Sequence, residues 1–508
     1  MATIIQNKWD NGQAEDVRTT SLNQNALSQN FDTITEPHRL NPMVSSVAES
    51  PTVVADSEMS DVLIGQVAGN NYYVGIGYES QSSYLTTFYT KTNVNGTFSK
   101  QAVGNYVYSK GSGVAYKNQV YAVEYQAGSP SYYNLIRFDG ANSVTTVGSA
   151  TVSSSSSTVL QAHCFVHPED NILYMLVGDT ISKWDGTTFS TVSTILPTGF
   201  SVSSVTNYGT YLAITMNSDT NSLSPVCYLW GRDTSINTLQ ETIDLGEGSV
   251  AIVENLNNNL IFVMSVGGYG QTVLDERMMI KEYAGNTVET LVNLVVGDLV
   301  GDPYSYKAKS GNHLYFVTAN SDCIWSFGKN KTGNYVLNQS RFIINGDKVT
   351  GYTYPYIGSI GGLSMIGDII WVAGYPMAGG DYIMMRTLSN SDGIAYAGTS
   401  IYKTTINPNM PIIDRYDEKQ LEAVQVSFTG SGGTIQIKYS VDGSEMSALI
   451  PTSENTTTLG KEDVIIMTNE DGGEPLLSGR EFQFQIESYG GVKIKELRYK
   501  YTNLNTTI

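Results

Sequence analysis

The residues best suited to chemistry in this 508-residue chain are His163, Cys164 and His167, which share the segment HCFVH. On a helix, the two histidines would lie on one face and could hold a zinc ion. The surrounding sequence is instead typical of a strand, where four residues span about 13 Å. Zn–N bonds are only about 2.0 Å long, so two rings on such a strand cannot reach one ion. We therefore predict no metal site at this segment.

Motifs that would identify a catalytic or cofactor site are missing from the sequence. It contains no phosphate-binding glycine loop, HExxH helix, GxSxG nucleophile turn or EF-hand loop. Carboxylates stand side by side at Asp275 and Glu276, but neighbours in a strand point to opposite faces and do not form the opposed pair that glycosidases need. We predict a protein that is not an enzyme, without catalytic, cofactor-binding or metal-binding residues and without a cofactor.

The segment TISKWDG presents Asp185 between Trp184 and Gly186. It suggests a WD-type repeat, a functional aspartate or an ordinary turn. The Gly-His partner of WD repeats is absent, and Asp-Gly is above all a turn signal. We interpret Asp185, like Asp139 before Gly140, as a turn residue. The aromatic residue before each turn is expected to pack between neighbouring repeats.

A short strand-like unit recurs along the chain and predicts the fold. Starts are spaced by roughly 40 to 55 residues, as in four-stranded propeller blades. Most copies begin with Asn or Asp and carry an aromatic residue at the same place. We predict an all-β chain with a seven-bladed β-propeller over residues 61–405, one of whose end blades includes a strand from before Val62. The copies begin at Asn70, Asn118, Asn171, Thr210, Asn259, Asn312 and Asp368.

From residue 418 to residue 508 the pattern changes to period-2 alternation, which indicates strands with one buried face. We predict a C-terminal β-sandwich with a hairpin at Gly490 and Gly491 and an Asp-Gly turn after Val441. Its expected core residues are Val424, Val426, Phe428, Ile435, Ile437, Phe482, Phe484 and Ile486.

Residues 1–60 lack strand alternation and predict an N-terminal arm with one short helix over a weak apolar stripe. Both a packed extension on the chain's own propeller and a contact with another chain fit this composition. Large apolar groups carry most interface energy, so Trp9, Phe31 and Leu40 are the expected assembly contacts.

Charge and composition limit the partners. The formal net charge is −19 and no Lys/Arg cluster is present, which disfavours stable nucleic-acid binding but suits a passage through which DNA slides. The three cysteines are far apart and predict no disulfide framework. No secretory signal is visible and no apolar run reaches the length of a membrane span. We expect synthesis in a cytoplasm.

The order of parts resembles virion proteins of tailed bacteriophages, in particular tail hub or nozzle proteins built on a β-propeller. The resemblance is carried by DNGQAEDVR and FDTITEPHRLNPM in the arm and by KQLEAVQVSFTGSGGTIQIKYSVDG in the C-terminal part. It implies a structural tail component made in the host cytoplasm and located in the virion. The partners it implies are copies of the same chain in a ring, other tail proteins, and DNA that passes without sequence-specific binding.

A second class of function is also open, because a fold does not determine a function. The chain would then be a glycan-binding or glycan-cleaving propeller, that is, a receptor-binding lectin or a depolymerase. Opposed carboxylates in an open central pocket would favour this alternative. Subunit contacts through the arm would favour the tail protein.

Overall fold

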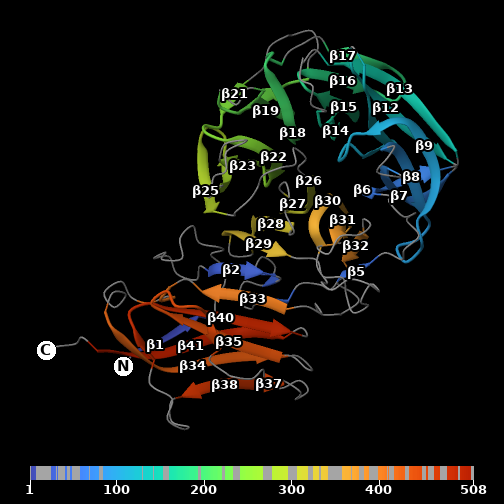
Figure 1. The fold of residues 1–508 in the computed structure, drawn as a ribbon. Coiled ribbons are helices and arrows are strands. Elements are labelled where there is room, and N and C mark those ends of the chain that lie inside the picture. Colours follow the sequence, from blue (N-terminus) through green and yellow to red (C-terminus); the bar gives the residue numbers. More distant parts are fainter. Residues whose placement is uncertain are drawn as a thin grey trace. The chain divides into compact units, whose positions relative to one another are not determined.

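The structure is a computed structural model, shown in Figure 1. It describes residues 2–6, 25–29, 31–32, 41–42, 46–48, 58–67, 69–78, 84–128, 130–140, 142–152, 160–192, 196–219, 223–232, 241–266, 277–295, 306–317, 324–330, 333–340, 357–367, 369–376, 383–387, 399–404, 406–408, 410, 417–429, 434–448, 454–455, 463–468, 477–489 and 492–504.

The described residues form an all-β fold, as the sequence predicts, and none of them is helical. Their segments accordingly include no helix that is long and apolar enough to span a membrane. The helix expected in the arm is wrong where the arm is described, because Leu27 and Phe31 lie in strands. Backbone pairing with strands far along the chain overrides the weak helical stripe there.

The chain divides into two compact units. A ring unit comprises Val47–Asp322 and Val349–Thr387, and a terminal unit comprises Met1–Ser46, Cys323–Lys348 and Leu388–Ile508. The predicted boundaries at residues 60, 405 and 418 stay predictions.

The ring unit consists of antiparallel sheets that follow one another along the chain. One sheet holds β6 (Glu58–Val67), β7 (Asn70–Tyr78), β8 (Leu85–Lys91), β9 (Ser99–Tyr108), β10 (Val114–Tyr116), β11 (Gln119–Gln126), β12 (Tyr132–Gly140) and β13 (Ser143–Thr151). Next come β14 (His163–His167), β15 (Ile172–Val177), β16 (Thr180–Trp184) and β17 (Phe189–Val192), then β18 (Phe200–Tyr208), β19 (Tyr211–Ser218), β20 (Val226–Trp230) and β21 (Glu241–Asp244). The last are β22 (Ser249–Leu256), β23 (Asn259–Val266), β24 (Arg277–Tyr283) and β25 (Val288–Val295), the pair β26 (Tyr306–Ser310) and β27 (His313–Val317), and β30 (Ile357–Ile366), β31 (Ile369–Pro376), β32 (Ile383–Thr387) and β5 (Ser46–Ala48).

The inner strands of these sheets form a closed ring, the arrangement of a β-propeller, which Figure 1 shows. Strand β5 joins the sheet of β30 to β32, which confirms that a strand from before Val62 completes an end sheet. Ring closure leaves few exposed strand edges. In succession, β6 contacts β10, β10 contacts β14, β14 contacts β18, β18 contacts β22, β22 contacts β27, β26 contacts β30, and β30 contacts β6.

The seven copies of the repeat lie on strands that each pair with the strand before them, namely β7, β11, β15, β19, β23, β27 and β31. The expected packing of aromatic residues between successive sheets is confirmed at two places. The indole nitrogen of Trp184 donates to the Tyr121 hydroxyl at 3.3 Å. Tyr174 meets Trp230 edge to face, with ring centroids 5.9 Å apart. The first contact joins β16 to β11, and the second joins β20 to β15.

The terminal unit contains two larger sheets that share one hydrophobic core. All eight core residues predicted from the alternation are buried, whereas Gln425, Gln436 and Gln483 are only partly buried. One sheet orders β1 (Ala2–Gln6), β41 (Lys493–Asn503), β34 (Lys419–Thr429) and β38 (Asp463–Thr468), with β39 (Leu477–Gly479) paired to β34. The other holds β28 (Ile324–Lys329), β29 (Tyr335–Ser340), β2 (Asn25–Gln29), β33 (Thr399–Thr404), β40 (Phe482–Tyr489), β35 (Thr434–Val441) and β36 (Ser447–Ala448), with β37 (Glu454–Asn455) paired to β35; β3 (Phe31–Asp32) and β4 (Asn41–Pro42) pair separately.

Two local expectations for the terminal unit have different outcomes. The Asp-Gly turn after Val441 is confirmed, since Asp442 and Gly443 both have positive φ, 49° and 77°. The hairpin at Gly490 and Gly491 is wrong, because β40 and β41 belong to different sheets. The alternation of both strands fits either arrangement, so it cannot distinguish a hairpin from a crossing between sheets.

Candidate functional site

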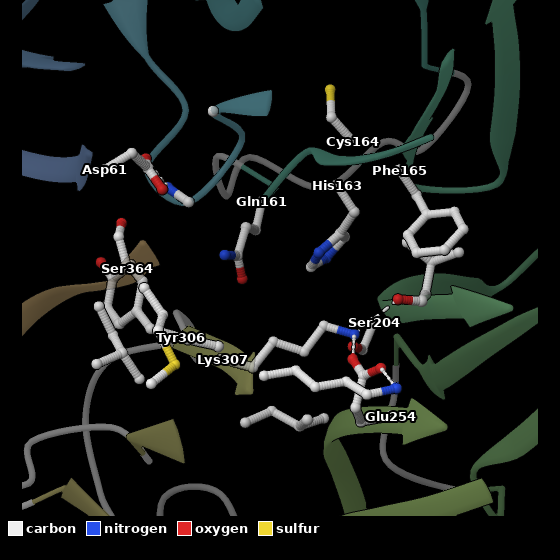
Figure 2. A pocket seen from close by; sticks show the side chains of 18 of the residues that line it. Asp61, Gln161, His163, Cys164, Phe165, Ser204, Glu254, Tyr306, Lys307 and Ser364 are labelled. Carbon is white, nitrogen blue, oxygen red and sulfur yellow. Dashed lines mark hydrogen bonds and ion pairs between the residues drawn. The ribbon is translucent and has the colours of Figure 1, made fainter. Parts of the chain in front are cut away.

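The inner strands of the ring unit surround a cavity of about 290 Å³ whose wall carries charged and polar side chains. Figure 2 shows them arriving from several strands: Asp61 from β6, His163 from β14, Glu254 from β22 and Lys307 from β26. Each strand contributes only one or a few groups, because alternate side chains of an inner strand face the cavity. The cavity therefore collects residues that are far apart in the sequence.

Glu254 is the most heavily engaged acid in this wall. Its carboxylate forms ion pairs with Lys307 at 2.9 Å and with Lys309 at 3.5 Å. It also accepts hydrogen bonds from the Thr206 hydroxyl and the Asn255 backbone amide, both at 3.2 Å. Burial raises the pKa of Glu254, but Lys307 and Lys309 outweigh burial and the net shift is downward. The Glu254 carboxylate is therefore ionised, and it is engaged by ion pairs and hydrogen bonds within the protein.

Lys307 connects three inner strands. Besides the ion pair, its ammonium group donates to the carbonyl of Val205 on β18 at 2.7 Å and to that of Val253 on β22 at 2.6 Å. A lysine has three N–H donors, so the three acceptors around Lys307 satisfy it completely. The residue fastens β18, β22 and β26 to one another.

Asp61 is buried in the opposite wall, on β6. One of its carboxylate oxygens accepts hydrogen bonds from the Tyr108 hydroxyl, the Gly111 amide at 3.2 Å and the Ser60 hydroxyl at 3.3 Å. Burial raises the pKa of Asp61 to about 6, against these hydrogen bonds, which lower it. Like Glu254, this acid is used to hold neighbouring chain segments together.

His163 differs from these charged residues because one of its ring nitrogens is not used. Its Nε2 atom is buried and has no hydrogen-bond partner among the described residues. Burial, and secondarily the charge of Lys307, lower the pKa of His163 to about 4, so the ring is neutral at pH 7. Figure 2 shows the ring projecting toward the side-chain stem of Lys307, near Gln161.

The HCFVH segment is a strand, as predicted, and its three candidate residues are dispersed rather than brought together. His163 faces the cavity, while the Cys164 thiol lies on the other side of β14 in Figure 2. The ring of His167 is 3.3 Å from the carbonyl oxygen of Tyr211. Within the described segments, no group of three or more His, Cys, Asp or Glu side chains is placed to hold a metal ion.

Asp185 occupies the turn predicted for it. It accepts hydrogen bonds at 2.7 Å from the amides of Thr187 and Thr188, and Gly186 has φ of 101°. These bonds, with the Thr187 hydroxyl foremost, lower the pKa of Asp185 to about 2. Asp139 also has a partner nearby in the sequence, because its carboxylate forms an ion pair with Arg137 at 2.5 Å.

The predicted assembly contacts remain untested. Trp9 and Leu40 lie outside the described residues. Phe31 is in β3, whose backbone pairs Phe31 with Pro42. The role of these residues stays a prediction.

The sequence reasoning missed Asp61, Glu254 and Lys307. Asp61 and Glu254 are single ionisable residues in the segments DVLIG and AIVEN, and Lys307 is one of two lysines in YKAK. Each lies one strand before a recognised repeat. Charge in a strand that precedes a repeat was the available signal. A charged residue in such a strand indicates that its side chain faces the axis of the ring. It does not indicate that charged residues from different strands lie close together.

Comparison with known proteins gives distant likenesses in structure alone. No protein-family model and no curated protein matches the chain. Solved structures similar to it include an exo-beta-1,3-galactanase from Phanerochaete chrysosporium, with 12% identity over 90% of this chain and 100% of that one and a TM-score of 0.31. A putative 6-phosphogluconolactonase from Bacteroides uniformis has 13% identity over 64% and 94% of the chains, with a TM-score of 0.39. The Cps50 (Swd1) beta-propeller domain of Myceliophteria thermophila has 10% identity over 68% and 100%, with a TM-score of 0.38.

Proposed function

We propose that this chain is a structural, non-enzymatic component of a tailed-bacteriophage tail, of the hub or nozzle type. Its architecture is a seven-bladed β-propeller with an N-terminal arm and a C-terminal β-sandwich. The inner strands of the seven blades are β6, β10, β14, β18, β22, β26 and β30. The phage assignment rests on the resemblance of the arm and of the C-terminal segment to tail proteins.

One observation supports the scaffold role: the acidic side chains of the cavity wall are engaged in hydrogen bonds and ion pairs within the protein. Glu254 receives four donors, counting Lys307 and Lys309, and one oxygen of Asp61 receives three. A glycosidase needs one carboxyl that can give a proton and another free to attack or to activate water. Carboxylates that are engaged by several segments of their own chain instead fix the neighbouring strands relative to one another.

The tail role implies a homo-oligomeric ring assembled with other tail proteins. DNA would pass through the lumen of that ring, and the net charge of −19 would keep the DNA from adhering to its wall. Trp9, Phe31 and Leu40 are the proposed assembly anchors.

Negative-stain electron microscopy and light scattering of the purified chain test this role. We expect closed rings for the unaltered chain. We expect folded, smaller species for the triple variant Trp9→Ser, Phe31→Ser, Leu40→Ser, with Ser50→Thr as the control. A chain that remains monomeric at every concentration, or a triple variant that still forms rings, contradicts the proposal. So does polysaccharide cleavage that Glu254→Gln abolishes.

A second function, glycan binding, is favoured by one observation. The cavity wall includes hydrogen-bonding side chains beside the aromatic ring of Phe165, and its volume is near the lower end of small-molecule pockets, about 300 Å³. Such a mixture of polar groups and an aromatic face suits sugars. A glycan-binding screen tests this function independently of ring assembly.

A further inference from the structure

The unused nitrogen of His163 restricts what the cavity can bind. A hydrogen bond with the backbone of Val202 raises the pKa of His163, which is the effect of a carbonyl that accepts from the ring. Because Nε2 has no partner, that bond uses Nδ1. A neutral imidazole has one N–H, so Nε2 is left as a buried acceptor that faces the cavity.

The surroundings of this acceptor exclude charged ligands. An anion offers no proton to Nε2. An ammonium group would approach Lys307 and Lys309, which lie in the same wall. At pH 7 the carboxylates of Glu254 and Asp61 in this wall together balance the charges of the two lysines, so the wall does not attract an anion either. A neutral hydroxyl group meets every condition, since it donates to Nε2 and accepts from a neighbouring donor.

We propose that the central cavity of the ring unit binds a neutral sugar, with a ligand hydroxyl donating to Nε2 of His163. Gln161 lies beside that ring in Figure 2, and its Nε2 donates to the Lys110 carbonyl at 3.3 Å, so its side-chain oxygen is the group that can accept from a second hydroxyl. Phe165 supplies the apolar face in the same wall. The proposal rests on the second function above and is independent of the tail role. It assigns ligand binding, and no catalytic reaction, to the cavity.

Isothermal titration of the full chain with monosaccharides tests the site. The probes are glucose, galactose and N-acetylglucosamine, with glucosamine as the cationic and glucuronate as the anionic comparison. We expect saturable binding of at least one neutral sugar and weaker binding of both charged ones. Because His163→Leu removes the acceptor and keeps the bulk, it should weaken binding about tenfold or more.

Two further variants separate a binding role from a folding role. His163→Gln restores an acceptor oxygen and should recover part of the affinity. His313→Leu makes the same change on β27, outside the cavity wall, and should leave affinity unchanged. Glycan binding that His163→Leu does not affect would overturn this site while leaving glycan binding as a function. Absence of binding to any neutral sugar, with the chain folded, would overturn both; equal affinity for charged sugars would overturn the proposed chemistry.

Discussion

Asp61 shows how one buried acid can make the stability of the ring unit depend on pH. Its pKa in the folded chain is about 6, whereas an exposed aspartate has a pKa of about 4. Between these values the folded state keeps a proton that the unfolded state has released. Raising the pH therefore lowers the free energy of unfolding across this window. The cost of ionising the buried Asp61 is absent below about pH 4 and constant above pH 6 to 7.

The variant Asp61→Asn should remove this dependence while retaining an acceptor oxygen for Tyr108 and Gly111. From pH 4 to pH 7 the unaltered chain should lose roughly 2 to 3 kcal/mol of unfolding free energy relative to the variant. Urea unfolding at both pH values measures the difference. The exposed Asp185→Asn serves as a comparison in which no loss of this sign is expected. Parallel pH profiles for Asp61→Asn and the unaltered chain would refute the prediction.

At the residue scale, the sequence predicted local roles better than the composition of the cavity. Asp185 and Asp442 were recognisable because a turn is encoded by adjacent residues. Asp61 and Glu254 are separated by more than 190 positions in the sequence. Only the closure of the ring places them around one space, and no local spacing records it.

The junction of the first and last sheets depends on a buried lysine at the end of β8. Lys91 lies 4.3 Å from the ring centroid of Trp371 on β31 and 4.6 Å from that of Phe98. Its ammonium group donates to the Val94 carbonyl at 2.9 Å. The aliphatic stem thus fills the junction, and the ammonium group lies against aromatic faces and a carbonyl.

Truncation and replacement of Lys91 should have different effects. Lys91→Ala leaves a cavity among large rings and should cost about 2 to 4 kcal/mol of unfolding free energy. Lys91→Met keeps the stem and adds a sulfur–aromatic contact, so it should stay within about 1 kcal/mol of the unaltered chain. Denaturant unfolding followed by tryptophan fluorescence measures both. Equal losses in the two variants would mean that the ammonium group, and not the stem, stabilises the junction.

Strands β6 and β30 meet closely at the same junction. A Cβ atom at Gly362 would lie 2.3 Å from the carbonyl oxygen of Ser60 and 2.4 Å from its Cα. Backbone atoms cannot move aside as a flexible side chain can. The Ser364 hydroxyl accepts from the Val62 amide at 2.9 Å and fixes the register of the two strands.

Gly362→Ala should therefore destabilise the ring unit by about 1 to 3 kcal/mol, the usual cost of overpacking. The control Gly311→Asn lies in a turn with φ of 56°, where an added Cβ meets nothing within 4 Å. Asparagine tolerates that conformation, so this variant should be close to neutral. Thermal unfolding compares the two. A neutral Gly362→Ala would show that the strands separate easily at this point.

At the element scale, periodicity and turn chemistry located the repeat strands of the ring unit and the strands that end in the turns at Gly140 and Gly186. The repeat at Asn171 became β15, and the segment ending in Gly186 became β16, because each strand pairs with its neighbour along the chain. The strands of the arm were not predicted, because their partners are not neighbours along the chain. Ala2 of β1 pairs with Tyr501, and a partner so far along the chain leaves no local pattern.

At the scale of the whole molecule, the two ends of the chain share one sheet. Strand β1 is antiparallel to β41 from Ala2 opposite Tyr501 to Gln6 opposite Leu497, and β34 pairs with the other edge of β41. Strand β1 therefore protects an edge of the sheet that carries the core of the terminal unit. The ring unit is compact in its own right and has its own hydrophobic clusters.

Deleting residues 2–6 should consequently affect the two units differently. The backbone amides of β41 that face β1 lose their acceptors, so hydrogen exchange between Leu497 and Tyr501 should accelerate by at least about tenfold, the effect of roughly 1.4 kcal/mol. Exchange in β22 and β23 should stay as it is, because their partners all lie within the ring unit. Mass spectrometry of exchanged peptides measures both regions in one sample. Unchanged protection of β41 would show that β1 adds nothing to that sheet, and equal acceleration in β23 would show that the units unfold together.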